Sequence, residues 1–353
     1  MRTIAIHCFA DPQQFYQSAT PAKWTQLLQE GRDLGLTAQL YALFKRHNLW
    51  QALPSKVQQH LSWGWRFYLR QRHALFFELQ QLEPSFVELD YPVLLLKGAA
   101  YQALGLTAAE GRLFSDIDLL VDRSAIQDCK GRLFMAGFYE AEVSAYDRFF
   151  YLTLSHECPP LVHVQRSSSI DLHFNIFPLA GRKHLNIEYF IQQRSTLSGS
   201  GFATPSLAML FIHAAIHFYW QEESHKMVKD LVDLFLLAQQ CQQLAAMDWV
   251  ILESKRLGAC EPVINCLLLL EQHFSLTLQP TEIAYEARLE YQCRFANYLI
   301  GAIVGKGAAA TPARWLWYLR GYLHKMTLPI LLRHSMHKFI SWLKRPAAVA
   351  SEK

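Results

Sequence analysis

The sequence of 353 residues lacks several features that define common protein classes. Its seven cysteines include no CxxC pair, which argues against both a disulfide framework and a structural zinc site. No window holds about 18 uninterrupted apolar residues, the length that a transmembrane helix requires. The apolar run near the N-terminus is too short for a signal peptide. These absences predict a cytoplasmic protein whose cysteines are buried thiols.

Charge is also sparse, with 18% charged residues against 51% hydrophobic ones. This composition excludes disorder as a description of the whole chain. A chain of this length can bury one large core or two modest ones.

Acidic residues are absent from Tyr291 to Ser351, although the net charge of the whole chain is only +4. Pro329 should divide this basic tail into two helices rich in Trp, Tyr and Leu. Such helices could lie on an anionic membrane surface or against nucleic acid. Packing on the core, with the basic side in water, is the simpler interpretation. The tail contains nine cations: Arg294, Lys306, Arg314, Arg320, Lys325, Arg333, Lys338, Lys344 and Arg345.

Residues 1–90 have the pattern of packed helices. Pro21 stands at a first-turn position before apolar residues with helical spacing, and Leu36–Phe44 continues the pattern. A longer helix is predicted for Lys56–Leu82, with Pro84 ending it. Six aromatic residues in this helix could form a base-stacking surface, but packing between helices is the simpler interpretation. They are Trp63, Trp65, Phe67, Tyr68, Phe76 and Phe77.

The most informative stretch begins with a strand, a turn and a helix start. The apolar run Val93–Leu96 is too short for a globular helix and suits a buried strand. Lys97 and Gly98 interrupt the run, and a helix is predicted from Ala99 to Leu104.

A second apolar strand, Ser115–Val121, carries two acids. Strand alternation places Asp116 and Asp118 on the same face. Two acids side by side on an apolar strand are unfavourable, because like charges repel and burial disfavours both. A divalent cation removes this cost, and carboxylate oxygens are ligands that suit Mg²⁺.

Further elements are predicted beyond Asp122. A helix from the N-cap Ser124 to Met135 should end at Gly137. The next apolar strand, Ser168–Phe174, carries an acid and a histidine two residues apart, on one face. Between the helix and this strand, three strands are predicted at Tyr139–Val143, Phe149–Leu154 and Leu161–Gln165.

Two histidines share a face of the helical region Pro205–Gln240. His213 and His217 have i, i+4 spacing, which can bind zinc. The HExxH context is absent, because Ala-Ala-Ile separates the two residues. A packed, hydrogen-bonded pair is therefore the preferred interpretation.

A strand, a glycine turn that opens a helix, and Asp-x-Asp on the next strand resemble the nucleotidyltransferase superfamily with a DNA polymerase β-like palm. The sequence is most similar to the branch called "uncharacterised nucleotidyltransferase". One departure is Gly98-Ala99, where the superfamily usually has Gly-Ser and so gains a hydroxyl for the phosphates. The matching residues are Leu96-Lys97-Gly98-Ala99-Ala100, Arg112 and Asp116-Ile117-Asp118-Leu119-Leu120-Val121.

The resemblance implies an α+β fold in three parts. Residues 91–200 would form the palm, a mixed sheet with flanking helices. Residues 1–90 would form a helical cap, and residues 201–353 a helical region that ends in the basic tail.

The resemblance also implies a metal-dependent reaction. Asp116, Asp118 and Asp171 would hold Mg²⁺ or Mn²⁺ and transfer NMP from an NTP, ATP included, to a hydroxyl, with release of pyrophosphate. Asp171 would be the third carboxylate and a possible base, although a solvent-facing edge-strand aspartate is the alternative. His173 would touch substrate or, as we prefer, brace the acid by a hydrogen bond.

Other residues would contact the nucleotide. Backbone N–H groups at the Gly98 turn would approach the phosphates, and Lys97 and Arg112 would supply positive charge. Lys226 and Asp230 match a basic residue and an acid of the branch. Lys226 would reach the phosphates while paired with Asp230, although a solvated charged face explains them equally well.

Two other functions stay open. The palm could be catalytically degenerate and serve as a nucleotide-sensing or protein-interaction module, or the same metal site could serve another phosphate-transfer or hydrolase activity. The acceptor could be a sugar, a tRNA, a protein or a small molecule, and the nucleotide base is not specified.

Overall fold

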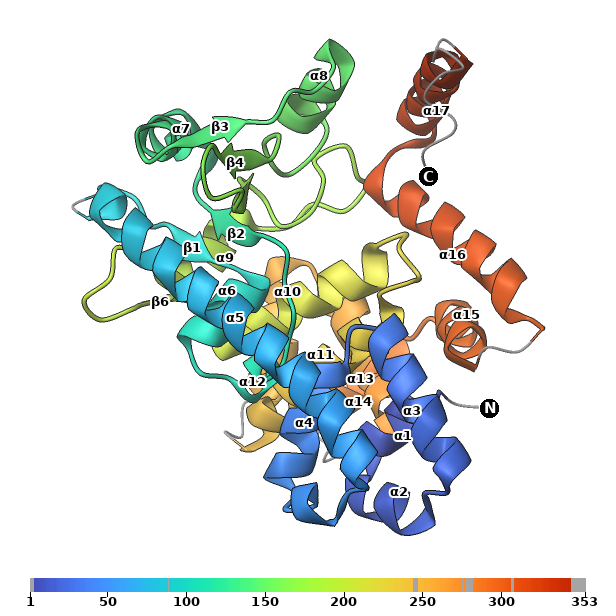
Figure 1. Ribbon diagram of the computed structural model, residues 1–353. Helices are drawn as coiled ribbons and strands as arrows, with labels where there is room; N and C mark the ends of the chain where they lie inside the picture. Colours follow the sequence, from blue (N-terminus) through green and yellow to red (C-terminus); the bar gives the residue numbers. More distant parts are fainter. Residues whose placement is uncertain are drawn as a thin grey trace.

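The computed structural model describes residues 3–87, 89–243, 247–274, 276, 282–305 and 308–343. Figure 1 shows a small sheet, with helical N-terminal and C-terminal regions packed beneath and beside it. The N-terminal helices are α1 (Ile4–Ala10), α2 (Pro12–Ser18), α3 (Pro21–Asp33), α4 (Thr37–Arg46) and α5 (Ser55–Phe86), with a 3₁₀ turn η1 at Trp50–Ala52.

The central region holds the strands and the helices between them. Its elements are β1 (Leu94–Leu95), α6 (Lys97–Ala103), η2 (Thr107–Ala109), β2 (Ile117–Leu120), η3 (Arg123–Ala125), α7 (Ile126–Met135), β3 (Phe138–Glu140), α8 (Ala145–Thr153), β4 (Leu161–His163), β5 (Ser169–His173), α9 (Ile187–Gln192), β6 (Arg194–Thr196) and β7 (Ala203–Pro205).

The C-terminal region is helical. Its elements are α10 (Leu207–Trp220), α11 (Met227–Gln243), α12 (Met247–Leu257), α13 (Cys260–Phe274), α14 (Glu282–Tyr291), α15 (Arg294–Gly305), α16 (Ala310–Lys325) and α17 (Leu328–Leu343). The predicted α+β class is confirmed. The division at residues 1–90, 91–200 and 201–353 remains a prediction.

The seven strands form one mixed sheet in the order β3-β4-β5-β2-β1-β7-β6. β2 pairs in parallel with β5 and antiparallel with β1, so it lies at the centre. All four residues of β2 are buried, which explains why this strand is apolar except for Asp118. The parallel register places Asp118 directly beside Asp171.

Helix α5 connects the N-terminal region to the sheet, and in Figure 1 it crosses in front of β1 and α6. The Gln71 carboxamide accepts a hydrogen bond from the Phe114 backbone N–H at 3.3 Å. Glu78 forms a bidentate pair with Arg166 at 2.7 and 2.8 Å. Helix α1 packs on α11 and α13 of the C-terminal region, so the N-terminal helices contact more than the palm.

Pro84 does not end α5, contrary to the prediction, because the helix continues to Phe86. A proline in the last turn removes one backbone hydrogen bond. Burial of Leu82 and Phe86 in the core opposes that loss.

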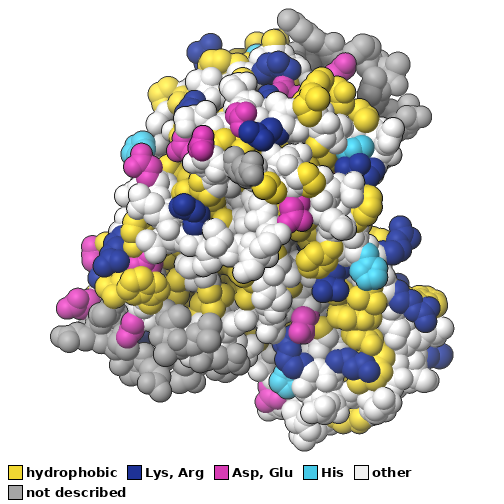
Figure 2. Space-filling model, turned by 90° about the vertical axis from the view of Figure 1, so that its left-hand side faces the viewer, with side chains coloured by type: hydrophobic (Ala, Val, Ile, Leu, Met, Phe, Trp, Pro, Cys, Tyr) yellow, Lys and Arg dark blue, Asp and Glu magenta, His cyan; other side chains and the backbone are white. Residues whose placement is uncertain are grey.

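The prediction that the aromatic residues of α5 pack in the core is wrong for several of them. Trp63, Phe67 and Phe77 are 56%, 48% and 49% exposed, whereas Trp65 stacks on Tyr41 with ring centroids 4.7 Å apart. A helix this long packs only one face against its neighbours, so the other face stays in solvent. In Figure 2, hydrophobic side chains lie beside Lys and Arg on the lower right lobe.

A second correction concerns Phe149–Leu154, predicted as a strand, since α8 covers Ala145–Thr153. The Ser144 hydroxyl accepts a hydrogen bond from the Asp147 N–H at 3.1 Å and donates one to its carboxylate at 2.7 Å. This reciprocal cap satisfies a free N–H group at the start of the helix. Likewise Asp122, not Ser124, caps the turn before α7.

The basic tail is divided near Pro329 into α16 and α17, as predicted. Three of its cations serve the fold: Arg320 donates to the Tyr219 carbonyl at 2.6 Å, Lys325 pairs with Glu222 at 2.5 Å, and Lys338 pairs with Asp147 at 2.6 Å. Lys306, Lys344 and Arg345 lie outside the described residues. An anionic partner therefore remains a prediction that depends, among the described residues, on Arg294, Arg314 and Arg333.

All seven cysteines are free thiols, and all but Cys293 are buried, as predicted. Within the described ranges, no helix has the length and apolar character needed to cross a membrane.

Candidate active site

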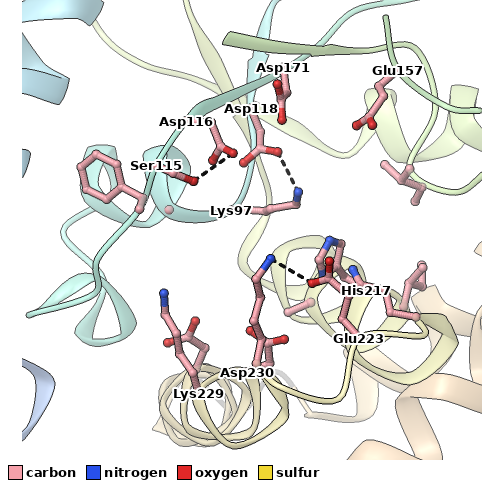
Figure 3. A pocket seen from close by; sticks show the side chains of 18 of the residues that line it. Lys97, Ser115, Asp116, Asp118, Glu157, Asp171, His217, Glu223, Lys229 and Asp230 are labelled. Carbon is pink, nitrogen blue, oxygen red and sulfur yellow. Dashed lines mark hydrogen bonds and ion pairs between the residues drawn. The ribbon is translucent and has the colours of Figure 1, made fainter. Parts of the chain in front are cut away.

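A cavity of about 360 Å³ lies between the centre of the sheet and helix α11. Figure 3 shows two opposing walls, one bearing Asp116, Asp118 and Asp171, the other Lys229 and Asp230. We call them the acid wall and the α11 wall. All nine residues predicted for the site except His173 line this cavity: Lys97, Gly98, Arg112, Asp116, Asp118, Asp171, Lys226 and Asp230.

The acid wall brings the three predicted carboxylates together. Asp118 and Asp171 are register partners on β2 and β5, and Asp116 lies directly before β2. The Ser115 hydroxyl donates to the Asp116 carboxylate at 3.1 Å. The solvent-facing alternative for Asp171 is excluded, because its side chain faces the cavity beside the other two acids (Figure 3).

Asp118 is the most strongly held of these acids. The Lys97 ammonium lies 2.7 Å and His173 Nε2 lies 3.1 Å from the same carboxylate oxygen, Oδ1. Although burial opposes ionisation, Lys97 and His173 hold the pKa of Asp118 well below its usual value. His173 therefore braces an acid, as we expected, but the acid is Asp118 of the neighbouring strand.

Lys97 has an unusual backbone, with φ at +44°. The left-handed region is unfavourable for a residue with a β-carbon, and such strain is concentrated at functional sites. In this conformation the Lys97 ammonium contacts Asp118.

Asp171 carries the opposite shift. Burial, together with the nearby charges of Glu157, Asp116 and Asp118, raises its pKa to about 6. Glu157 is a further carboxylate beside the acid wall, which was not predicted because it lies in a loop without strand alternation. A divalent cation would relieve the repulsion between Asp116, Asp118 and Asp171, and carboxylate oxygens are ligands that suit Mg²⁺.

The α11 wall is organised by Arg112. Its Nε donates to Asp233 Oδ2 at 2.7 Å, and Gln39 donates to the other oxygen of Asp233 at 2.9 Å. A β-carbon added to Gly98 would lie 2.5 Å from Arg112 Nη1. Gly98 lies in the first turn of α6, so its missing side chain gives room to the guanidinium. Asp233 and Gln39 were not predicted, because they come from distant parts of the chain.

The predicted pair of Lys226 with Asp230 does not form. Lys226 lies just before α11 and pairs with Glu223 at 2.9 Å. Lys229 lies near Asp233 and Asp230 instead, and its Nζ donates to the Leu113 carbonyl at 2.8 Å. Burial and the charge of Asp233 raise the pKa of Asp230 to about 6.

Acids outnumber cations around the cavity. Seven carboxylates and five Lys or Arg side chains line it. A triphosphate would meet net repulsion here unless divalent cations first neutralised part of the acid wall. The charge balance thus fits the predicted metal requirement.

His213 and His217 form a packed pair, with ring centroids 6.3 Å apart. In the described part of the chain they belong to no group of three ligand atoms close enough for one ion. Burial lowers the pKa of both, so they are neutral at neutral pH. The two rings pack as expected, but among the described residues no hydrogen bond joins them, and the Nδ1 atom of His213 has no hydrogen-bond partner there.

The structure has the features of a nucleotidyltransferase palm. Two central strands carry carboxylates beside one another, a helix starts at a lysine–glycine turn, and helices line the cavity. Residues 20–275 match the family described as "Uncharacterised nucleotidyltransferase", and the chain belongs to this family. No curated protein and no solved structure gave a significant match. Membership supports a role in nucleotidyl transfer.

Proposed function

We propose that the protein transfers NMP from a nucleoside triphosphate to a hydroxyl acceptor and releases pyrophosphate. One observation supports this most strongly. The three carboxylates of Asp116, Asp118 and Asp171 lie together on one wall of the cavity, and the opposite wall carries cations. The acid wall suits divalent cations, and the cations suit phosphate oxygens.

Asp116 and Asp118 would hold both divalent ions, Mg²⁺ or Mn²⁺, and Asp171 would hold the ion nearer the acceptor. When bound, such ions lower the pKa of a coordinated hydroxyl and neutralise charge on phosphates. Asp171 would also take the proton of the acceptor. The acceptor oxygen would then bond to the α-phosphorus while the bond from that phosphorus to pyrophosphate breaks.

The remaining residues position the substrate. Arg112, fixed by Asp233, would bind phosphate oxygens with the donors that it does not share with the aspartate. Lys226 is 53% exposed, and in the described part of the chain its ion pair is with Glu223, so it can turn toward a triphosphate. Asp230 would orient the cations of the α11 wall. Lys97 would exchange part of its contact with Asp118 for the phosphates.

The acceptor and the nucleotide base stay open among the classes named above. We place the reaction in the cytoplasm, a proposal supported by the seven free thiols.

Calorimetric titration of ATP, GTP, CTP and UTP with Mg²⁺ tests the proposal. We expect metal-dependent binding of at least one triphosphate, lost in the double variant Asp116→Asn/Asp118→Asn. Absence of binding to all four would reject it. Incubation with α-labelled triphosphate then distinguishes pyrophosphate from orthophosphate, and release of orthophosphate would indicate the hydrolase alternative.

One observation favours the degenerate module instead. The Lys97 ammonium already neutralises Asp118 at 2.7 Å, as a metal ion would, and Ala99 replaces the superfamily serine. A module of this kind would bind nucleotide without Mg²⁺, or would bind none, and would release no pyrophosphate.

A further inference from the structure

Next to the acid wall lies a second group of ligand atoms with different chemistry. It consists of His156 and Glu157 in the loop after α8, and His173 at the end of β5. The loop is fixed to β5 by backbone hydrogen bonds, from the Cys158 N–H to the Leu172 carbonyl at 2.8 Å and from the Phe174 N–H to the His156 carbonyl at 2.9 Å. These bonds place the three side chains together.

Their separations fit a shared ion. Glu157 Oε2 lies 3.5 Å from His173 Nδ1 and 3.9 Å from His156 Nε2, and one ligand atom from each residue lies within 4.8 Å of the others. Ligands bound tetrahedrally at about 2.1 Å are roughly 3.4 Å apart. Small side-chain rotations would close the remaining difference.

The Glu157 carboxylate does not form good hydrogen bonds with the two imidazole rings. Among the described residues, no hydrogen bond of normal geometry joins Glu157 to either ring, since 3.5 and 3.9 Å are too long or poorly aligned. An ion between the three groups would give each of them a direct ligand bond.

The outward nitrogens of both rings already have partners. His173 Nε2 faces Asp118 Oδ1 at 3.1 Å, and His156 Nδ1 faces the Ser155 hydroxyl at 3.5 Å. Histidines that bind metals usually have the second nitrogen bonded to a carboxylate or another polar group, which fixes the orientation of the ring. Both rings are thus oriented toward Glu157.

We propose that His156, Glu157 and His173 bind a divalent transition-metal ion of the Zn²⁺ class, separate from the magnesium site of the aspartates. Two imidazole nitrogens and one carboxylate oxygen suit Zn²⁺, whereas the all-oxygen acid wall suits Mg²⁺. An ion on Nδ1 of His173 requires the proton on Nε2, which then donates to Asp118. The ion is thereby a positioning element for a residue of the proposed magnesium site.

Calorimetry tests this proposal. Metals are first removed from the full-length protein with a chelator, and Zn²⁺ is then titrated into it in the presence of 5 mM Mg²⁺. We expect one equivalent to bind with micromolar or lower Kd, and Co²⁺ to give visible absorption typical of a four- or five-coordinate ion. Glu157→Gln and His156→Ala should each weaken Zn²⁺ binding by about 100-fold or more.

Two control variants locate the ion. His184→Ala alters an exposed histidine outside the group and should not change Zn²⁺ binding. Asp116→Asn removes a proposed Mg²⁺ ligand and should leave the cobalt spectrum intact. Glu157→Gln conserves shape, so it decides the question if His156→Ala fails to fold.

The proposal is overturned if no Zn²⁺ binds, if Glu157→Gln binds it as tightly as the unaltered protein, or if Asp116→Asn abolishes it. The outcome of this experiment can be distinguished from the outcome of the test of the proposed function. Zn²⁺ binding without triphosphate binding would reject nucleotidyl transfer alone, and the reverse would reject only the transition-metal site.

Discussion

The two walls of the cavity use different secondary structure for different tasks. The acid wall carries short side chains on neighbouring strands, where the register between β2 and β5 fixes Asp118 beside Asp171. The α11 wall carries long side chains, and its cations are oriented one by one by Asp233, the Leu113 carbonyl and Glu223. Metal ions require ligands at fixed distances, whereas a flexible triphosphate can be bound by long cationic side chains that are each held by a separate partner.

The largest effect should come from breaking the acid wall. We expect Asp118→Asn to lower NMP transfer by about 10³-fold or more, because a ligand for the divalent ions is lost at a cost of several kcal/mol. Pyrophosphate release measures this. Asp122→Asn is the matched control, because Asp122 lies just beyond β2 and caps Ser124 outside the cavity. Equal activity of Asp118→Asn and the control would remove Asp118 from the mechanism.

The α11 wall can be perturbed by a substitution that replaces no charged residue. In Gly98→Ala the new β-carbon would lie 2.5 Å from Arg112 Nη1, so the guanidinium must shift. We expect the KM for the triphosphate to rise about tenfold, the loss of roughly one charge-assisted hydrogen bond. The kinetics of Gly131→Ala provide the comparison, because a β-carbon there meets no atom within 4 Å. An unchanged KM in Gly98→Ala would exclude phosphate binding by Arg112.

Asp230 is an acid on the wall that we assign to phosphates, and its ionisation should destabilise the fold. Its pKa is about 6 in the folded protein and 3.8 for an ordinary aspartate. The folded state therefore binds more protons than the unfolded state between these values, and stability falls as the pH rises from about 4 through 6.

Asp230→Asn should thus be more stable than the unaltered protein at pH 8, by about 1–3 kcal/mol, with no advantage near pH 4. We favour the lower half of this range because the side chain faces the cavity and is partly exposed. Urea unfolding at both pH values measures the difference. An advantage that is equal at pH 4 and pH 8 would contradict the assigned pKa. Asp122→Asn, whose acid has a lowered pKa, should show no such gain.

Lys226→Ala should have the smallest effect on the α11 wall. Its side chain is 53% exposed and already paired with Glu223, so we expect the KM for the triphosphate to rise about twofold to fivefold. High salt should reduce the difference, because an exposed charge is screened. An effect as large as that of Gly98→Ala would show that Lys226 contributes as much to phosphate binding as Arg112 does.

Local sequence determined the acid wall. Short apolar strands with one or two acids are recognisable without long-range information, since strand alternation assigns Asp116 and Asp118 to one face. The choice of Asp171 as the third carboxylate followed from resemblance to a known family, and the parallel pairing that places it beside Asp118 was not predicted. The free, buried cysteines were also predictable, because their number and spacing exclude a disulfide framework.

The wrong predictions of secondary structure and burial fall where two features of the sequence favour different outcomes. The aromatic residues of Phe149–Leu154 suit a strand, but Ser144 and Asp147 form a helix cap that decides for α8. On α5, aromatic composition suggested burial, yet exposure depends on which helix face has a neighbour. Trp63 and Trp65 have the same chemistry and different environments for this reason.

The sequence by itself determined the class of the fold, the strands that carry the acids, and the chemistry that those acids suit. Only the tertiary structure decided which groups meet across the cavity: Glu157 beside His156 and His173, Asp233 on Arg112, and the space at Gly98 that the guanidinium fills. The reason is physical. Periodicity and capping act over a few residues, whereas ion pairs and ligand groups form between segments that the folded core brings together.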